Sequence, residues 1–444
     1  MLMTNVLDNA QRNRLFWASC LALISTSVAF GVITESASEL PDQYGLEGNQ
    51  LGYVLGAAIS GFAFAIILLG PAIDKIGIAV TIRMAFFCHL IGTLILMFSG
   101  SFVMAFLGAS VIALGNGAVE AGCNPLVATL FPNNKTTKLN VFHVFWPVGI
   151  IVGAMFGYWI SGVSAGVEGW SLFGLDALQA KLALILVPTL IYGYMFRNQI
   201  IPQTERVQSK VSDAQMWDAV KSPFFMLMLF CMMLTASLEL GPNRWMRLAM
   251  GPSVESAFNV TDSGILVLVY GSALMAVLRF YAGGLVKRFA PTGILFASSI
   301  LAGLGLYAMS GAQDPWMLII SATVFYVGVC FYWPTMLGVV AEQIPRTGAV
   351  GLCLMGGVGM LIAGYVTIPQ IQSFAVGFEA VADANNPTAA SLRASFQWVA
   401  VCAIPLAIIF WMMHRRFGQG GYSTKSISSG SASQSDPVQE TAGV

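Results

Sequence analysis

The stretch FVMAFLGASVIALGNGAVEAGCNPLVATLF, residues 102–131, carries one carboxylate, Glu120, inside an apolar segment long enough to span a bilayer. A carboxylate at the bilayer centre costs about 2.5–3.5 kcal/mol on insertion scales, so a chain that keeps one neutralises it, pairs it or uses it. Asn116, Glu120 and Asn124 are spaced four residues apart, so a helix places them on one face. We therefore expect a transmembrane helix whose polar face lines the protein interior or a water-filled path.

The composition of the whole chain indicates a polytopic membrane protein. Of its 444 residues, 57% are hydrophobic and 9% are charged, whereas soluble domains carry about 25% charged residues. The formal net charge is zero, so no nucleic-acid partner is expected. The sequence shows no nucleophile triad, phosphate loop or metal-ligand cluster, and its seven cysteines lie in apolar segments, as free thiols do. We expect a protein that is not an enzyme and binds neither cofactor nor metal.

Apolar runs of about 20 residues, the length that spans a bilayer, occur twelve times. They cover approximately residues 15–37, 50–72, 79–99, 102–131, 138–162, 177–196, 223–247, 262–286, 291–311, 315–341, 347–373 and 394–413. The longest hydrophilic interval between them divides the spans six and six. The predicted organisation is an N-terminal six-helix bundle over 1–196, a cytoplasmic linker over 197–222, a C-terminal six-helix bundle over 223–416 and a disordered cytoplasmic tail over 417–444.

Lysine and arginine residues gather on one side of the predicted spans. Five of the 21 lie elsewhere, namely Lys181, Arg244, Arg247 and Arg393 on the opposite side and Arg279 within the membrane. The others lie on the side of the N-terminus, the linker and the tail. Positively charged loops favour the cytoplasm, so both termini are predicted to be cytoplasmic. The expected location is the plasma membrane, and a bacterial inner membrane is favoured.

The two halves carry similar short motifs at corresponding places. Gly70-Pro-Ala-Ile-Asp-Lys-Ile-Gly77 follows the second span, and Gly283-Gly-Leu-Val-Lys-Arg288 follows the eighth. Pro132 ends the fourth span and Pro345 ends the tenth. Such internal symmetry is typical of duplicated transporters.

Three charged residues near these loops are predicted to form a cytoplasmic gate. Asp74 and Lys75 belong to the loop motif, and Arg279 lies near the inner end of the eighth span. Charges and helix ends at such places can hold one conformation closed. We expect none of the three to contact substrate.

With these features in view, the chain resembles the major facilitator superfamily. The loop motif Gly-x-x-x-Asp-Arg/Lys-x-Gly of that superfamily matches residues 70–77, and the resemblance covers the whole chain. It implies an all-α membrane protein whose twelve transmembrane helices form two pseudo-symmetric six-helix bundles, the major facilitator fold.

Within the superfamily, residues 114–127 and 138–145 resemble the fucose permease family of sugar:proton symporters. That resemblance implies that Glu120 is the family glutamate of helix four. In helix five, Lys138 stands where the family has an arginine and His143 where it has a glutamine, which leaves the solute open. The family also has an acid in helix one, for which Glu35 is the nearest counterpart, with an ordinary interfacial acid as the alternative.

Polar and aromatic residues of span five suit a sugar. Asn140, His143 and Trp146 recur every three residues, and Asn116 and Asn124 flank Glu120. Amide and imidazole groups can bond hydroxyls, and an indole can cover the apolar face of a sugar ring. The alternative is helix packing, with the polar groups as interhelical hydrogen bonds.

The second half offers further candidate binding residues. Thr235, Glu239 and Asn243 repeat at four-residue spacing in span seven, and Gly241-Pro242 is predicted to break that helix, as in transporter binding sites. Arg244 could pair with Glu239, which would make that acid structural. Tyr332 and Trp333 lie in span ten at the place that symmetry gives to Glu120, and they are candidate stacking surfaces.

These observations together predict a secondary active transporter. We expect proton-coupled symport of a monosaccharide or related small polar solute by alternating access, with Glu120 and Glu35 as proton-coupling residues and the proton as coupling ion. A carboxyl group removed from water can exchange a proton near neutral pH, which suits that role. A proton-coupled exporter of drugs or metabolites and a non-transporting sensor on the same fold are the alternatives. The expected partners are the lipid bilayer and the solute, and the expected state is a monomer.

Overall fold

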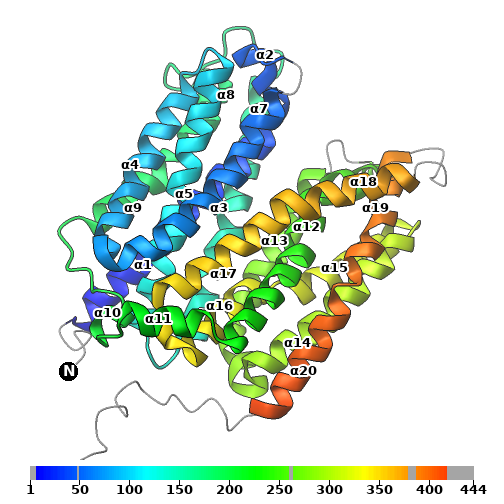
Figure 1. Ribbon diagram of the computed structural model, residues 1–444. Coiled ribbons are helices and arrows are strands. Elements are labelled where there is room, and N and C mark those ends of the chain that lie inside the picture. Colours follow the sequence, from blue (N-terminus) through cyan, green and yellow to red (C-terminus); the bar gives the residue numbers. More distant parts are fainter. Residues whose placement is uncertain (1–6, 48–49, 260–263, 379–386, 418–444) are drawn as a thin grey trace, which may run out of the picture.

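The computed structural model describes residues 7–47, 50–259, 264–378 and 387–417, which form helices joined by short connections (Figure 1). The predicted disordered tail, from residue 418 onward, lies outside the described residues. Eleven helices are long and apolar enough to cross a membrane, and the shorter apolar helix Gly264–Phe280 makes twelve with them. The all-α, twelve-span architecture predicted from hydropathy is confirmed.

The first six spans form the N-terminal bundle. Spans five and six are each interrupted, at residues 143–144 and 184–185, because neither pair is helical. The helices are α1 (Asn9–Glu35), α3 (Gln50–Ile76), α4 (Ile78–Met97), α5 (Phe102–Leu130), α6 (Lys135–Phe142), α7 (Phe145–Ser164), α8 (Ala177–Ala183) and α9 (Leu186–Phe196), with the short η2 (Ser36–Ser38) and α2 (Leu40–Tyr44) after α1.

The last six spans form the C-terminal bundle. Short α10 (Glu205–Gln208) and α11 (Asp213–Val220) lie in the linker before it. The bundle comprises α12 (Pro223–Phe258), α13 (Gly264–Phe280), α14 (Ala282–Gly311), α15 (Pro315–Val329), α16 (Tyr332–Gln343), η3 (Pro345–Thr347), α17 (Gly348–Ile362), the π-helical turn η4 (Ala363–Thr367), α18 (Ile368–Phe378), α19 (Pro387–Ala400) and α20 (Ala403–Phe417). The backbone of Ala290 is not helical, so span eight ends within α14 and span nine begins at Pro291.

The predicted break at Gly241-Pro242 is wrong, because α12 continues through both residues. A proline inside a membrane helix removes one backbone hydrogen bond, and neighbouring helices can compensate for its loss. The missing side chain of Gly241 lets the π-helical turn approach, since a Cβ there would lie 2.6 Å from Cγ2 of Thr367. The Thr367 hydroxyl also donates to Ser237 Oγ at 2.7 Å. Close packing therefore replaces the expected break.

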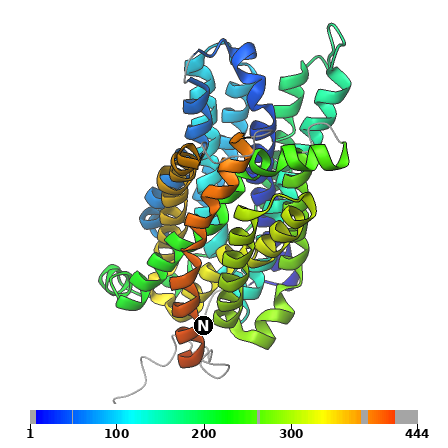
Figure 2. The ribbon, with the colours of Figure 1, turned by 90° about the vertical axis from the view of Figure 1, so that its right-hand side faces the viewer.

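Both views place the start of α1, the end of α20 and the linker helices at one end of the molecule (Figures 1 and 2). We call this the terminal end, and we call the end with α2 and the start of α8 the distal end. The two bundles lie closest at the terminal end and are farther apart at the distal end (Figure 1).

Polar contacts between the bundles hold the terminal end together. The carboxylate of Glu342 accepts from the backbone N–H of Thr136 at 2.9 Å and from its hydroxyl at 2.7 Å. Lys135 donates to the carbonyl of Ala341 at 3.1 Å and pairs with Glu205 of the linker at 2.7 Å. Because Lys135 and Thr136 begin α6, the acid also meets the positive end of that helix dipole.

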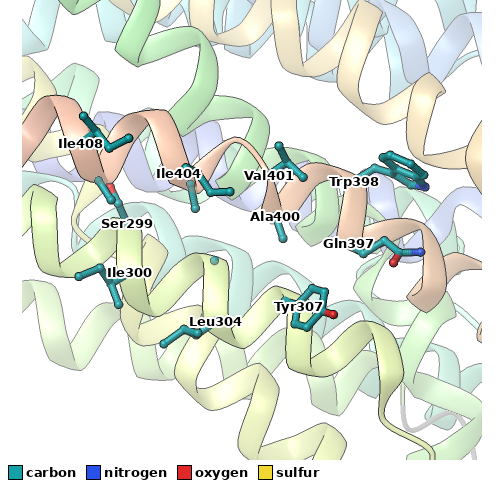
Figure 3. A pocket seen from close by; sticks show the side chains of 13 residues that line it. Ser299, Ile300, Leu304, Tyr307, Gln397, Trp398, Ala400, Val401, Ile404 and Ile408 are labelled. Carbon is teal, nitrogen blue, oxygen red and sulfur yellow. The ribbon is translucent and has the colours of Figure 1, made fainter.

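A large hollow lies on the outer side of the C-terminal bundle. It has a volume of about 600 Å³ and runs between α14 and the pair α19–α20. Figure 3 shows Ile300 and Leu304 facing Ile404 and Ile408 across it. Its lining contains no charged side chain, in contrast to the space between the two bundles.

Candidate functional site

A small cavity of about 30 Å³ lies between the bundles at the centre of the molecule. That volume holds about one or two water molecules. Three of the groups that line it are charged side chains, the acids Glu120 and Glu239 and the base Arg279. The rest of the lining consists of His143, Phe62, Trp146, Leu240, Trp333 and Met360. Both bundles therefore contribute to one enclosed polar centre.

Arg279 connects the two bundles at this centre. Its guanidinium donates to Glu239 Oε1 at 3.0 Å, to the carbonyl of Cys330 at 2.5 Å and to the carbonyl of His143 at 3.1 Å. The Arg279 side chain is almost wholly buried, and Glu239 is too. A buried charge needs such a full set of partners, because an unpaired one is very costly away from water.

The two carbonyls that Arg279 binds are freed by prolines. Pro147 and Pro334 stand four residues after His143 and Cys330 and have no N–H to complete the helical bond. Each carbonyl lies at a break, between α6 and α7 or between α15 and α16. Non-helical backbone at membrane depth is tolerated where protein groups satisfy it, and Arg279 does so at both breaks.

Glu120 is held in a different way. Nδ2 of Asn124 donates to its Oε2, and Oδ1 of Asn124 lies 3.1 Å from Nε2 of His143. All three side chains are buried. Within the described residues Glu120 makes no salt bridge, so Arg279 directly neutralises only Glu239. With all three groups ionised the cluster of Glu120, Glu239 and Arg279 carries one net negative charge, which one proton cancels.

A second, larger cavity extends from this centre toward the distal end. Its volume is about 170 Å³, and it shares Trp146, Leu240 and Met360 with the central cavity. Its walls come from both bundles and include Thr34 and Glu35 of α1 and Asn243, Arg244 and Arg247 of α12. Trp146 stands between the two cavities, stacked on Phe62 with ring centroids 6.3 Å apart. We call the two spaces the central cavity and the distal cavity.

Comparison with known proteins decides the family. Residues 15–367 match the Major Facilitator Superfamily. The chain belongs to this superfamily. The match covers most of the chain and includes every residue of the central cavity.

Solved structures of this superfamily share the fold. The fucose:proton symporter FucP of E. coli, in the outward conformation, superposes with a TM-score of 0.70 at 16% identity, over 90% of this chain and 98% of that chain. The proton:xylose symporter XylE of E. coli gives 0.72 at 14% identity, over 91% and 96%. A D-xylose transporter of Levilactobacillus brevis is 26% identical over 156 residues, which are 35% of this chain and 34% of that protein. This alignment thus spans about a third of the relative's length.

The superfamily fold brings several of the predicted site residues together. Glu120, His143, Trp146, Glu239 and Trp333 line the central cavity. Asn124 joins Glu120 to His143, and Asn243 lines the distal cavity, where its Oδ1 accepts from the Tyr326 hydroxyl at 3.0 Å. The partner of Glu239 is Arg279 and not Arg244.

Three other predicted binding residues lie apart from the central cavity. Oδ1 of Asn116 accepts from Nε2–H of His89 at 2.9 Å, and Asn116 lines a small space of about 20 Å³ toward the distal end. Asn140 donates to the Thr335 hydroxyl of the other bundle at 3.3 Å. Tyr332 is fully buried and lines neither of the two cavities, because its neighbour Trp333 takes the cavity-facing position.

Glu35, a predicted proton-coupling residue, lies in a cluster of charged side chains at the wall of the distal cavity. Its carboxylate lies 3.3 Å from the ammonium of Lys181 and accepts from the Ser161 hydroxyl at 3.0 Å. Lys181 is wholly buried and also pairs with Glu39 at 2.5 Å. These contacts anchor Glu35 within the N-terminal bundle, and its role in proton coupling stays a prediction.

The predicted gate residues divide between two places. Asp74 lies at the terminal end, where it pairs with Arg206 and accepts from the Thr204 hydroxyl, both of the linker. Lys75 beside it is exposed. Arg279 lies apart from Asp74 and Lys75, in the lining of the central cavity with Glu120 and Glu239, and its gating role stays a prediction. Its contacts are with elements distant in the sequence.

Sequence reasoning missed the two carbonyl acceptors and the full lining of the central cavity. One signal was present, since Trp146-Pro147 and Trp333-Pro334 are the same dipeptide and each predicts a free carbonyl four residues before its proline. An intramembrane arginine is the natural partner of such carbonyls. For Phe62, Leu240 and Met360 no signal was available, because apolar residues in a membrane helix look alike whether they face lipid, protein or a cavity.

Proposed function

We propose that this protein is a secondary active transporter that moves a monosaccharide or related small polar solute together with a proton. The observation that carries the proposal is the unequal pairing in the central cavity, where two carboxylates share one guanidinium. Arg279 binds Glu239, so Glu120 is the group that takes the proton. Membership of the superfamily points to a transporter and not to an enzyme.

Proton binding and solute binding are linked through the charge of this cavity. An occluded, water-poor cavity favours the neutral cluster over the charged one, because a buried net charge is costly. Protonation of Glu120 therefore favours closure around the solute, and release of the proton on the other side favours opening. Such coupling is reciprocal, so the solute must raise the affinity for the proton as much as the proton raises the affinity for the solute.

An unpartnered polar atom at the central cavity suits a solute that carries hydroxyl groups. Glu239 Oε2 is buried and has no hydrogen-bond partner among the described residues. Trp146 and Trp333 offer flat apolar faces to the same cavity. A sugar presents hydroxyl donors at its edge and C–H groups on its face, and the D-xylose transporter, FucP and XylE relatives support this class of solute.

The distribution of charge supports one orientation in the membrane. The positive-inside tendency places the terminal end in the cytoplasm, so the distal cavity belongs to the outer side. In that orientation the present conformation is closed toward the cytoplasm by Glu342, Lys135 and Asp74. Rocking of one bundle against the other would break these contacts and expose the centre to the inside. We infer an inner membrane location with both termini cytoplasmic.

Uptake by the purified protein in proteoliposomes tests the proposal. Labelled neutral and acidic monosaccharides are supplied with the outside acidic, with the outside alkaline and without a gradient, and protein-free liposomes serve as the control. The proposal predicts accumulation when the outside is acidic, abolished by nigericin. Accumulation under the opposite gradient would identify an exporter that works by antiport, and no flux under any gradient would identify a sensor.

A further inference from the structure

Arg244 lines the distal cavity and extends from the C-terminal bundle toward the N-terminal one. Its guanidinium donates to the Thr34 hydroxyl of α1 at 3.3 Å. It also lines the small space in which Asn116 lies, so the side chain stands between two hollows of the bundle interface. In the described part of the chain, no carboxylate lies within salt-bridge distance of Arg244.

The cationic residues that are buried in the protein, unlike the exposed Arg244, are bound by acids or by carbonyls. Lys181 pairs with Glu35 and Glu39, and Arg279 pairs with Glu239. Arg393, near the distal end, donates to the carbonyl of Ala249 at 2.7 Å. Arg244 differs from these, because a single hydroxyl is the bond that the fold provides for its five N–H donors.

The other charged groups that line the distal cavity have partners. Glu35 is the acid in its lining, and it pairs with Lys181, which also pairs with Glu39. Arg247, one turn after Arg244, lines the same cavity and has an interaction of its own. The charge of Arg244 is thus available to a solute, and a positive charge in a narrow, low-dielectric space attracts anions more strongly than the same charge on an open surface.

We propose that the solute carries a carboxylate, as a sugar acid does, and that Arg244 binds it. The inference rests on the proposed function and specifies its solute class. A planar guanidinium binds a carboxylate through two parallel hydrogen bonds, a geometry that an ammonium cannot reproduce. The Thr34 hydroxyl lies beside the guanidinium and is placed to donate to the same group. The rest of the sugar then extends toward the central cavity, with its C–H face against Trp146.

The charge of the solute determines whether transport with one proton moves net charge across the membrane. A monocarboxylate that moves with one proton transfers no net charge, whereas a neutral sugar that moves with one proton transfers one positive charge. A membrane potential therefore drives the second process and leaves the first unchanged. Transport of a sugar acid should respond to the pH gradient alone.

The test uses the full chain in proteoliposomes, with D-glucuronate and D-glucose as probes. Uptake is measured under an outside-acid gradient, with or without a valinomycin-induced potential, and binding is measured by competition. We expect glucuronate to bind at least about tenfold more tightly than glucose and to enter at a rate independent of the potential. Arg244→Gln should remove this preference, and Arg244→Lys should restore part of it. Arg83→Gln, which removes an exposed arginine of α4 away from both cavities, should leave it unchanged.

Two results would overturn the inference. Proton-driven, electrogenic uptake of glucose equal to that of glucuronate would reject it while leaving the proposed function intact. Retention of the glucuronate preference in Arg244→Gln would reject the assigned residue. Absence of proton-driven uptake for both probes and for the wider sugar panel would reject the proposed function itself. Should Arg244→Gln fail to fold, the response of the wild-type rate to the potential still decides the question.

Discussion

Glu120 and Glu239 are both buried carboxylates of the central cavity, but they meet different partners. Glu239 bonds a guanidinium, whereas Glu120 bonds the amide of Asn124, which in turn contacts His143. An amide can turn to offer its oxygen or its nitrogen, so Asn124 can serve the charged and the protonated form of Glu120. We therefore propose separate tasks for the two acids, in which Glu239 holds the guanidinium that bonds the other bundle and Glu120 exchanges the proton.

Removal of Arg279 should be among the most destabilising single changes. Arg279→Gln leaves Glu239 buried without a cation and leaves the carbonyls of His143 and Cys330 unsatisfied, so we expect a loss of about 3–5 kcal/mol in stability. Thermal unfolding in detergent measures it. The double variant Arg279→Gln with Glu239→Gln removes both charges, and it should recover part of the loss. Equal unfolding temperatures for wild type and Arg279→Gln would contradict this account of the ion pair.

Glu35 provides a second prediction at the residue scale. Because Glu35 is bonded to Lys181 and Ser161 of its own bundle, we expect Glu35→Gln to leave the proton:solute stoichiometry unchanged. It should lower stability, since it weakens the pairing of a buried lysine that keeps Glu39 as a partner. Uptake at imposed pH gradients measures the stoichiometry. Loss of gradient-driven accumulation in a folded Glu35→Gln protein would assign the proton-coupling role to this residue.

Several residues of the candidate site could be predicted from the sequence because their residue types are uncommon in membrane segments. An acid, a histidine and tryptophans in membrane segments identified Glu120, Glu239, His143, Trp146 and Trp333. The partner of each depended on contacts between helices far apart in the chain, which the spacing along one helix cannot provide. The sequence therefore predicts neither the bonds of Arg279 to the carbonyls of His143 and Cys330 nor the ion pair of Glu35 with Lys181.

Among the secondary-structure elements, two helix interruptions help to build the central cavity. The breaks between α6 and α7 and between α15 and α16 offer their carbonyls to one arginine. Hydropathy predicted both spans as continuous, since an interruption of two residues hardly changes the mean over a span. The sequence predicts a break at Pro242 of α12, but the helix continues there, and Gly241 beside it packs closely against Thr367. Whether a proline bends or breaks a membrane helix thus depends on what its neighbours supply.

Pro147→Ala tests the importance of the first break. The alanine N–H can bond the His143 carbonyl and so compete with Arg279 for it. A hydrogen bond to a charged group contributes about 1.5–3 kcal/mol, so we expect uptake to fall by at least about tenfold while the protein still folds.

Pro188→Ala is the matched control for this change. It also follows a helix interruption, but the carbonyl of Leu184, four residues before it, already accepts from the N–H of Val187 at 3.3 Å. Its uptake should stay close to that of wild type. Equal activity of Pro147→Ala and wild type would show that the freed carbonyl is dispensable.

Alternating access requires that the contacts between the bundles at the terminal end can open. Glu342 accepts two hydrogen bonds from Thr136 of the other bundle, and Glu342→Gln weakens both. Cys353 reports on the result, because it is 2% exposed where α17 packs against Gly70 of α3. We expect its labelling by a membrane-permeant maleimide, followed by peptide mass spectrometry, to rise about tenfold.

Asp314→Asn is the control for this measurement. Asp314 caps α15 at the distal end, and asparagine serves equally well there. Labelling of Cys231, which is buried in α12, should stay low in both variants. If Glu342→Gln left the labelling rate of Cys353 unchanged, other contacts would be holding the terminal end together.

Most of the arrangement of the transmembrane helices could be predicted from the sequence. Twelve apolar runs, their division by residues 197–222 and the repeated loop motifs predicted two six-helix bundles, and the superfamily match agrees. The conformational state was not predictable, since the same helices form the closed and the open terminal end. It is set by a few side-chain contacts such as those of Glu342, Lys135 and Asp74.

The central claim, that Glu120 carries the coupled proton, is tested most directly by solute-induced pH change in proteoliposomes without an imposed gradient. Addition of a transported solute should make the medium around wild-type vesicles alkaline, because each solute enters with a proton. Glu120→Gln mimics the protonated side chain, so it should still exchange labelled solute between the two sides but give no pH change. Alkalinisation by Glu120→Gln equal to that of wild type would contradict the account.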